Sequence, residues 1–529
     1  MTLKLHYERP QRARYCQVIN SLERAFFVAA AITIVAVIAG GFFGREAQAA
    51  SPDHALPGRF GRMFPNLPPF APPNDTVRAA LMELGKPGGL IDARDDLGAG
   101  PAALITDPLL SLNNPNNPPQ TAGSTFMAQF LIHDITFDPA SPLGKPTRPE
   151  TAQNARNPFL DLDSVYGDGP DGSPALYDPN DRIKFRVESG GLFEDLPRDG
   201  NNVAIIADPR NDEHMIIAGL QAAFLIFHNK AVDLVRSRST SVSNDDAFRE
   251  ARRLTTWHYQ WMILHEFLPL FVGQPMVSGI LANGRKFYTP FKGQTFIPVE
   301  FQSGNRFGHS MVRPSYRANL AGDNGQPFFG MIFDPSQQGE ADPDDLRGGA
   351  RAPRRFIGWQ TFFDFGDGAV KPNKRIDTKL SSPLFNLPLQ AIVTGDPPTA
   401  LAQRNLLRHL TWQLPSGQAI ARQMGAPVLG SKDLAELRNI HPSFDVSTPL
   451  WYYILKEAEL MENGLHLGPV GGRIVGEVFI GLLQADPSSY GNVQPNWQPT
   501  LPTKTGKPQD FRMIDFLTFA GVDPVSRGQ

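Results

Sequence analysis

Cysteine is almost absent from this chain, which has a single one, Cys16, in 529 residues. A disulfide framework is therefore excluded, and so is a metal site built from several thiolates. Charge of one sign is lacking too, because 50 Lys and Arg residues stand against 53 Asp and Glu residues. The chain has no excess of positive charge, so its composition does not indicate nucleic acid as a partner. These exclusions leave a large globular protein, and we expect it to be an enzyme.

Long apolar runs are also scarce, and the clearest one covers residues 25–43, behind a basic stretch. Ala47-Gln48-Ala49 follows it and fits the small-x-small pattern at which signal peptides are cleaved. We expect residues 1–49 to be a signal peptide or an N-terminal membrane anchor, since ~20 apolar residues suffice to span a bilayer. Both interpretations predict that the catalytic domain lies outside the cytoplasm. The protein would be either secreted or periplasmic, or attached to a membrane through residues 25–43.

Proline and glycine, by contrast, are abundant, with 49 and 48 residues, and predict long irregular loops. Residues 50–120 are rich in Pro and Asn, and we expect an arm wrapped over the surface. One helix is expected there at 75–84, capped by Asp75 or Thr76. Helical apolar spacing in residues 121–529 predicts a single, mainly α domain with few short strands. The expected helices cover residues 124–134, 214–236, 245–271, 399–410, 449–463 and 469–483, and a strand is expected near 284–288.

Two segments carry side chains suited to chemistry. Gln129 and His133 are four residues apart, so they share one face of the first expected helix. A lone histidine on an apolar helix is more often a satisfied core residue. In the second segment, the side chains of Asn157, Asp161 and Asp163 and the carbonyl of Phe159 can converge on one hard cation, because Ca²⁺ accepts six to eight oxygens. A surface loop of Asx turns explains the same residues equally well.

Three further segments are less specific by themselves. The acids of residues 208–213 precede an apolar helix, where they can stabilise its N-terminus. Gly308 beside His309 allows a flat ligand to approach the backbone closely. Asn405 and Arg408 lie on an otherwise helical stretch.

Together, and in this order, the five segments resemble the animal-type haem peroxidases of the peroxidase–cyclooxygenase superfamily over most of residues 75–485. The motifs that carry the resemblance are Gln129-x-x-x-His133-Asp134, the segment Asp161-Leu162-Asp163-Ser164-Val165-Tyr166-Gly167, Arg210-x-x-Glu213, Arg306-Phe307-Gly308-His309 and Asn405-x-x-Arg408. The resemblance implies a helical haem-peroxidase domain over residues 121–529, with haem b and Ca²⁺ as cofactors.

On the distal side, the resemblance implies His133 as the base that moves a proton between the two peroxide oxygens. Such a base is typically worth ~10²–10⁴ in rate. Arg210 and Gln129 would stabilise the charge on the departing oxygen. Glu213 resembles the acid that can form an ester with the haem. Ile132 stands where mammalian members have a second ester-forming aspartate, so at most one covalent link is expected.

On the proximal side, His309 resembles the ligand of the haem iron, with Arg306 beside it. Asn405 and Arg408 resemble the partner helix that helps to bind the cofactor. A neutral iron-bound imidazole needs an acceptor for its other nitrogen, and the side-chain carbonyl of Asn405 is suited to that role. We expect His133 and His309 to lie on opposite sides of one porphyrin.

The resemblance also adds a ligand to the cation loop. Asp134, next to the distal base, would bind the same Ca²⁺ as Asn157, Phe159, Asp161 and Asp163. Asn157 and Asp163 stand where many members have Thr and Ser, and both can still coordinate the ion.

Three functions follow from this resemblance. The first is a peroxidase that uses hydrogen peroxide to oxidise a phenol, halide or thiocyanate donor. The second is a fatty-acid dioxygenase with a lipid substrate, which forms a radical on a tyrosine three residues before the proximal histidine. Arg306 occupies that position here, and the nearest tyrosines in sequence are Tyr288 and Tyr316. The third is a non-catalytic adhesion protein, which would not need His133, Arg210 or His309.

Overall fold

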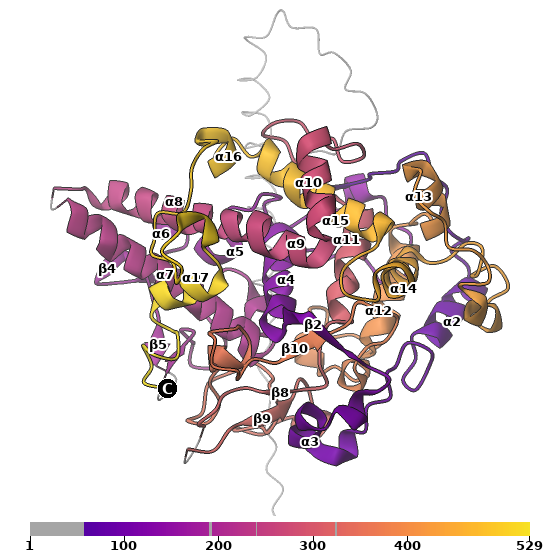
Figure 1. Cartoon of the computed structure of the whole chain (residues 1–529), viewed down its shortest axis with the longest axis horizontal. Helices are drawn as coiled ribbons and strands as arrows, with labels where there is room; N and C mark the ends of the chain where they lie inside the picture. Colours follow the sequence, from indigo (N-terminus) through magenta and orange to yellow (C-terminus); the bar gives the residue numbers. More distant parts are fainter. Residues whose placement is uncertain (1–57, 190–192, 240, 323–324) are drawn as a thin grey trace, which may run out of the picture. The chain divides into compact units, whose positions relative to one another are not determined.

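The computed structural model describes residues 58–189, 193–239, 241–322 and 325–529. The expected signal peptide or anchor at 1–49 lies outside the described residues. Helices dominate the described part, and its strands form only two-stranded pairs (Figure 1). The predicted mainly α class is therefore confirmed.

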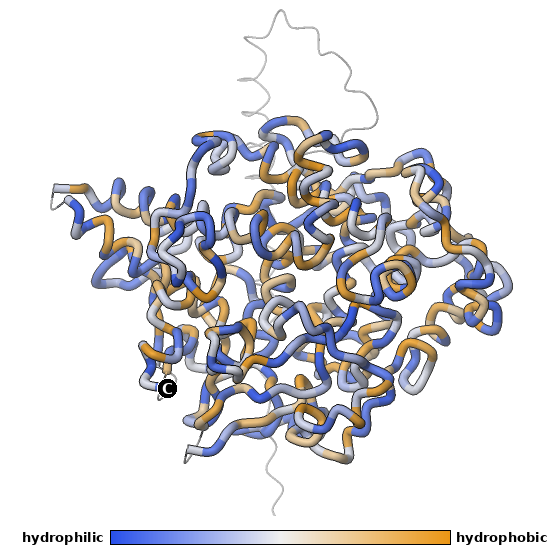
Figure 2. Tube along the Cα trace, viewed as in Figure 1, coloured by the Kyte–Doolittle hydropathy of each residue, from blue (hydrophilic) through white to orange (hydrophobic). Residues whose placement is uncertain are grey.

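The core is organised around α7 (Met215–Arg238), whose buried face contacts α4 (Ala122–Ile135) and α17 (Met513–Ala520). Phe224 of α7 stacks on Phe130 of α4 with ring centroids 4.4 Å apart. Hydrophobic and hydrophilic stretches alternate along most helices (Figure 2), as expected where one face of each is buried. By length and composition α7 is the one described helix that could cross a membrane, and 83% of its most apolar window is buried inside the protein.

Six of the helical predictions correspond to observed helices. The bounds of these helices are α2 Asp75–Leu84, α4 Ala122–Ile135, α7 Met215–Arg238, α12 Leu401–Thr411, α14 Leu450–Glu462 and α15 Pro469–Ala485. The expected helix at 245–271 is divided into α8 (Asn244–Met262), a π-helical turn (Ile263–Phe267) and α9 (Leu268–Val272). Pro269 begins this last piece, where its missing N–H breaks the regular hydrogen-bond ladder.

The remaining helices and the strands are short. The helices are α3 Gly100–Thr106, α5 Asp163–Tyr166, α6 Gly169–Gly172, α10 Gln274–Asn283, α11 Val299–Gly304, α13 Gly417–Met424 and α16 Tyr490–Val493. The strands are β1 Phe60–Gly61, β2 Asn116–Thr121, β3 Tyr177–Asp178, β4 Asp181–Phe185, β5 Glu188–Ser189, β6 Glu194–Asp195, β7 Ile297–Pro298, β8 Ser315–Arg317, β9 Phe329–Met331 and β10 Pro372–Lys374.

The described part of the expected arm pairs with later segments of the chain. Strand β1 runs parallel to β7, β2 is antiparallel to β10, and α2 packs against α12. These contacts place the segment against the helical body. The division into an arm at 50–120 and a catalytic domain at 121–529 stays a prediction.

Two local predictions were wrong. Residues 284–288 form no strand, because the backbone N–H groups of Lys286, Phe287 and Tyr288 donate to the buried carboxylate of Glu477 on α15. Helix α2 is capped by Asn74, whose side-chain oxygen accepts from the N–H of Val77 at 2.9 Å, and not by Asp75 or Thr76.

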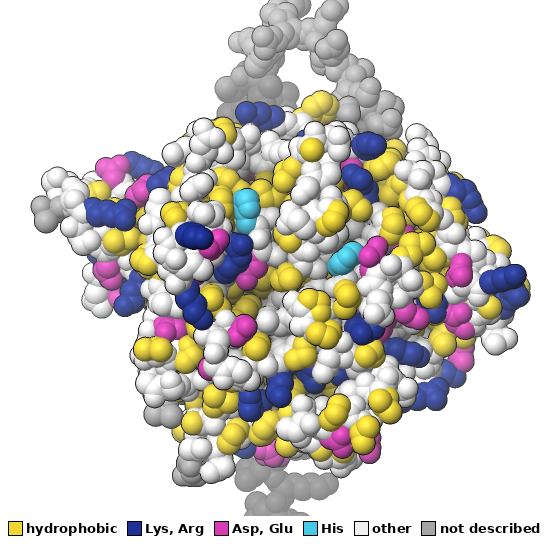
Figure 3. Space-filling model, in the orientation of Figure 1, with side chains coloured by type: hydrophobic (Ala, Val, Ile, Leu, Met, Phe, Trp, Pro, Cys, Tyr) yellow, Lys and Arg dark blue, Asp and Glu magenta, His cyan; other side chains and the backbone are white. Residues whose placement is uncertain are grey.

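The surface carries charge of both signs. On the face shown in Figure 3, Lys and Arg side chains are interspersed with Asp and Glu side chains. This mixture agrees with the near balance of charged residues in the sequence.

Candidate active site

One cavity brings the two predicted histidines together. His133, from the last turn of α4, and His309, from the 3-10 turn Asn305–His309, both line a space of about 250 Å³. The space continues into a region lined also by Arg210, Arg306 and Arg408. Each of the two adjoining spaces measures about 250 Å³, close to the lower end of the ~300–1000 Å³ that is common for ligand pockets. Most other lining residues are apolar, among them Phe126, Ile132, Val312, Ile332, Phe333, Leu384, Leu387 and Leu401.

His133 is held as a neutral imidazole. Its Nδ1 lies 2.8 Å from Oδ1 of Asn211, and Nδ2 of Asn211 donates to Oε1 of Gln221. Because Nδ2 of Asn211 is engaged in this way, its Oδ1 accepts and the proton of His133 lies on Nδ1. Desolvation and the positive charge of Arg210 lower the pKa of His133 to about 3. Its Nε2 therefore keeps a free lone pair at neutral pH.

Arg210 is fixed by several partners at once. Its Nε and Nη2 donate to the two carboxylate oxygens of Asp208, at 2.9 and 2.7 Å. Nη1 donates to the carbonyl of Thr136 and Nη2 to that of His133, while Phe137 lies under the guanidinium at 4.2 Å. Four of the five N–H groups of an arginine are thus engaged, and one on Nη1 remains for a ligand.

Gln129 is oriented by a chain of donors and acceptors that begins at the start of α7. The N–H of Ile217 donates to Nδ1 of His214, so the proton of this ring lies on Nε2 and is donated to Oε1 of Gln129 at 2.9 Å. The amide nitrogen of Gln129 then donates to Glu213 at 3.1 Å. Desolvation raises the pKa of Glu213 to about 8, so its carboxyl group holds a proton at neutral pH.

The proximal residues are adjacent, but one atom differs from the prediction. Asn405 contacts His309 Nδ1 at 2.7 Å through its amide nitrogen, whereas the sequence predicted its carbonyl there. The carbonyl instead accepts from Nη1 of Arg306, which has only donors to offer. A half-turn of the amide would present the carbonyl to His309, and Nη1 of Arg306 would then need another acceptor.

Three arginines gather at the same end of the cavity. Arg408 pairs with Asp138 at 2.7 Å. Arg306 donates to the carbonyls of Gln302 and Asn405 and has no carboxylate partner in the described part of the chain. Desolvation and the nearby charge of Arg408 lower its pKa to about 9. Arg404, which the sequence analysis missed, also lines this region and bonds only to uncharged oxygens.

The predicted cation ligands converge as well. Asp134, Asp161 and Asp163 offer oxygens that lie within 4.8 Å of one another. Asn157 joins them, because its amide donates to Asp161 at 2.8 Å and its N–H donates to Asp163 at 2.9 Å. Phe159 lies in the same loop, with its N–H bonded to the carbonyl of Asn157. Burial raises the pKa of Asp163 to about 7, and Oδ1 of Asp163 has no hydrogen-bond partner.

Asp134 fastens this loop to α4. It accepts from the N–H of Leu162, the hydroxyl of Ser164 and the hydroxyl of Tyr259 at 3.0–3.2 Å. Leu162 has a left-handed backbone with φ of 61°, which typically costs about 1–3 kcal/mol. Burial and the neighbouring carboxylates raise the pKa of Asp134. No local sequence signal pointed to Tyr259, which reaches the site from α8.

Residues 110–346 match the family model described as animal haem peroxidase. This stretch of the chain is a domain of the animal haem peroxidase family. Membership in this family implies haem as the cofactor. The matched region includes the distal residues, the cation loop and His309, whereas Asn405 and Arg408 lie beyond it.

Relatives of the family show how far the likeness extends. Chorion peroxidase of Aedes aegypti is 25% identical over 174 residues, which are 30% of this chain and 22% of that protein. The solved structure of peroxidase A from Dictyostelium discoideum has a TM-score of 0.59 at 17% identity, covering 82% of this chain and 88% of its own. The solved structure of a fatty acid alpha-dioxygenase of Arabidopsis thaliana has a TM-score of 0.54 at 15% identity, and the match covers 89% of this chain and 77% of that one. At these identities, the two structures establish the fold alone.

The residues of this chain fit a haem on three counts. His133 and His309 both line each of the two adjoining spaces. Arg306 is a desolvated cation that lacks a carboxylate partner in the described part, and a haem propionate would supply one. A Cβ added to Gly308 would meet no atom within 4 Å, so the backbone beside His309 is open to a flat ring.

Proposed function

We propose that the protein is a haem-dependent peroxidase that reduces hydrogen peroxide and oxidises a small donor of the phenol, halide or thiocyanate type. The observation that carries this proposal is the neutral His133, which faces the same cavity as His309 with Arg210 beside it. A proton acceptor and a cation in one apolar cavity are the groups that cleavage of a peroxide bond requires.

The proximal residues are suited to hold the cofactor. His309 would bind the iron through Nε2, with Asn405 turned so that its carbonyl accepts from Nδ1. Arg306 and Arg408 would pair with the propionates, and Glu213 would form the single ester link. When bound, haem supplies an iron atom at which the peroxide bond is broken and through which a donor is oxidised.

The distal residues of this chain would then move one proton and stabilise charge. Nε2 of His133 accepts a proton from one peroxide oxygen and returns it to the other, which leaves as water. The free N–H on Nη1 of Arg210 and the second amide hydrogen of Gln129 stabilise negative charge on the departing oxygen. Removal of one such donor typically costs ~10²–10³ in rate.

We further propose that Asp134, Asn157, Phe159, Asp161 and Asp163 bind Ca²⁺. One buried and two half-buried carboxylates, all with raised pKa values, repel one another unless a cation neutralises them. Removal of Ca²⁺ should lower activity before the protein unfolds, because Asp134 directly follows the distal base. Thermal unfolding and turnover, measured together in a chelator series, check this order. Full activity in a verified calcium-free sample would contradict the proposal.

A fatty-acid dioxygenase is the second candidate, because most of the cavity lining is apolar. Among the described residues, however, the lining includes no tyrosine that could carry the radical, and the position three before His309 is Arg306. Oxygen uptake with linoleate and no added peroxide would favour this alternative. A non-catalytic adhesion protein would not need His133, Arg210 and His309 together in one cavity.

Stopped-flow spectroscopy tests the peroxidase proposal. Haem-loaded protein is mixed with hydrogen peroxide and then with a panel of phenols, halides and thiocyanate. A rapid change of the Soret band that a donor reverses would support the proposal, and an unchanged spectrum would refute it. We also propose that the protein works outside the cytoplasm, which rests only on the pattern in residues 1–49.

A further inference from the structure

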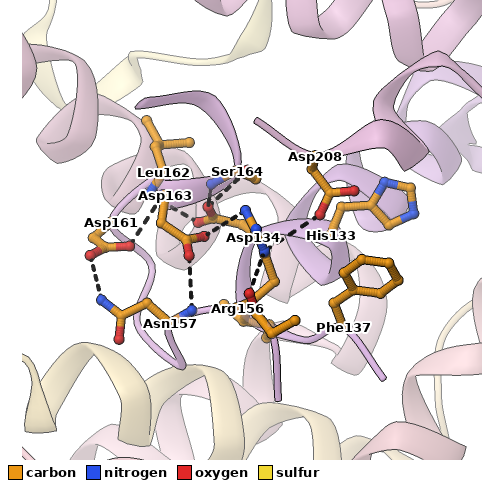
Figure 4. A network of polar contacts seen from close by, with 12 residues as sticks. His133, Asp134, Phe137, Arg156, Asn157, Asp161, Leu162, Asp163, Ser164 and Asp208 are labelled. Atoms are coloured by element: carbon orange, nitrogen blue, oxygen red, sulfur yellow. Dashed lines mark hydrogen bonds and ion pairs between the residues drawn. The ribbon is translucent and has the colours of Figure 1, made fainter. Parts of the chain in front are cut away.

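Arg156 lies between the cation loop and the distal arginine. Its Nη1 is 3.7 Å from Oδ1 of Asp163, and its Nε is 3.7 Å from Oδ2 of Asp208 (Figure 4). The side chain is only 16% exposed, so solvent screens these interactions weakly. Neither contact is short enough to be a hydrogen bond, and Nε donates instead to the carbonyl of Ala155 at 3.0 Å. The guanidinium thus lies beside both carboxylates and interacts with them through its charge.

Asp208 carries this link onward. Its fully buried carboxylate accepts two hydrogen bonds from the guanidinium of Arg210. Burial by itself would raise the pKa of Asp208, but Arg210 and Arg156 reverse this effect and lower it. Charges of alternating sign therefore run through Asp163, Arg156, Asp208 and Arg210.

We propose that Arg156 is a positioning residue that couples occupancy of the cation site to the orientation of Arg210. A cation bound at Oδ1 of Asp163 neutralises that carboxylate and repels the guanidinium of Arg156. Arg156 then pairs with Asp208 and fixes the carboxylate that orients Arg210. With the cation site empty, Asp163 draws Arg156 away from Asp208. This coupling rests on the proposed function and adds a means of regulation to it.

The same cation is also connected to His133, independently of Arg156. His133 directly precedes Asp134, a proposed ligand of the cation, on α4, so loss of the cation affects the base as well as Arg210. Removal of Arg156 should therefore abolish only part of the dependence on calcium.

Arg252 provides a matched control. Its charge acts on Asp161 in the same cluster, and its guanidinium lies 4.7 Å from the centre of the Tyr166 ring. No contact joins Arg252 to Asp208 in the described part of the chain. R156Q and R252Q each remove one positive charge beside the cation site, but only R156Q removes the link to Arg210.

The experiment measures two quantities on the haem-loaded protein. Calorimetry gives the calcium affinity, and stopped-flow mixing gives the rate constant with peroxide at saturating calcium and after chelation. We expect both variants to bind calcium several-fold more tightly, because each lacks a repelling charge. Only R156Q should lower the rate constant at saturating calcium, by about tenfold. Only R156Q should also reduce the ratio of the rate constant at saturating calcium to the rate constant after chelation. R156K, which keeps the charge, should restore part of the rate constant at saturating calcium and part of the ratio.

Several results would overturn the coupling. Equal rates in R156Q and R252Q, or an unchanged ratio in R156Q, would show that Arg156 does not act on Arg210. If R156Q does not fold, as judged by thermal unfolding, R156M takes its place, since it keeps the aliphatic stem without the charge, and a ratio equal to that of the wild type would overturn the coupling. A wild-type protein that binds haem and calcium but does not react with peroxide would refute the peroxidase proposal and the coupling with it.

Discussion

The two sides of the cavity are held in different ways. On the distal side, His133 is fixed through Asn211 and Gln221. Arg210 is fixed by the nearby carboxylate of Asp208 and by two backbone carbonyls of the segment that contains His133. On the proximal side, His309 has one hydrogen-bond partner among the described residues, Asn405, whose amide nitrogen faces it.

The difference predicts which half of the cavity would depend on a bound haem. The distal groups hold their protonation states and directions through protein contacts alone, which is the preorganisation that stabilises charge in a transition state. The proximal half still has a desolvated arginine without a carboxylate and an amide facing the wrong way for an iron ligand. Haem binding is therefore expected to complete the proximal side and to leave the distal side almost unchanged.

The largest expected effects separate the two sides directly. His133→Ala should lower the rate of reaction with peroxide by ~10²–10⁴ while haem content stays normal, because only the proton acceptor is lost. His309→Ala should instead abolish stable haem binding. Soret absorbance per protein and stopped-flow rates, measured on both variants, check the contrast. Loss of haem from His133→Ala would contradict it.

Asp208→Asn tests how far Arg210 depends on its carboxylate. The substitution removes the charge that accepts two hydrogen bonds from the guanidinium. We expect the rate with peroxide to fall by ~10²–10³, the cost of a misplaced charge donor. Arg306→Gln is the proximal counterpart and should speed haem dissociation with little change in that rate. A larger rate loss in Arg306→Gln than in Asp208→Asn would reverse the comparison.

The pKa of Glu213 predicts a dependence of stability on pH in the protein without added haem. Its pKa of about 8 lies above the ordinary 4.5, so the folded state holds the proton more tightly than the unfolded state. The stabilisation is therefore complete below pH 4.5 and is lost as the pH rises through 8. After allowance for solvent in the cavity, we expect a loss of about 2–3 kcal/mol.

Glu213→Gln isolates this effect, because glutamine does not titrate. The free energy of unfolding of the wild type, relative to Glu213→Gln, should fall between pH 5 and 8 in chemical denaturation. A constant difference across this range would mean that Glu213 is ionised throughout.

The smallest effect concerns the support of the distal base. Asn211→Ala removes the acceptor of Nδ1–H, and one such hydrogen bond is worth about 1 kcal/mol, so a rate loss of about fivefold to tenfold is expected. The dependence of the rate on pH should shift as well, since the tautomer of His133 is no longer fixed. A variant with the wild-type rate and pH profile would show that the ring needs no such anchor.

Much of the fold could be predicted because the signal was local. The spacing of Gln129 and His133 predicted their shared position on α4, and apolar periodicity predicted the long helix α7. The strand near 284–288 failed because Glu477, far away in the sequence, takes the backbone N–H groups that a strand would need.

The supporting residues of the site could not be predicted in the same way. Asn211 stands in an acidic stretch that helix capping already explains, and only the fold brings it to His133. Tyr259 reaches Asp134 from α8, and Arg404 gathers with Arg306 through packing of α12 on α11. Partners of this kind depend on tertiary contacts, for which a single sequence carries no periodic signal.

Consecutive positions on α4 serve two different centres, since His133 faces the cavity and Asp134 holds the cation loop. Neighbours on a helix point about 100° apart, so a single turn of backbone aims one side chain at each centre. Inserting or deleting one residue upstream within the helix would swing both side chains by that angle together. A protein engineer could therefore not re-aim the base without also detaching the ion-binding loop.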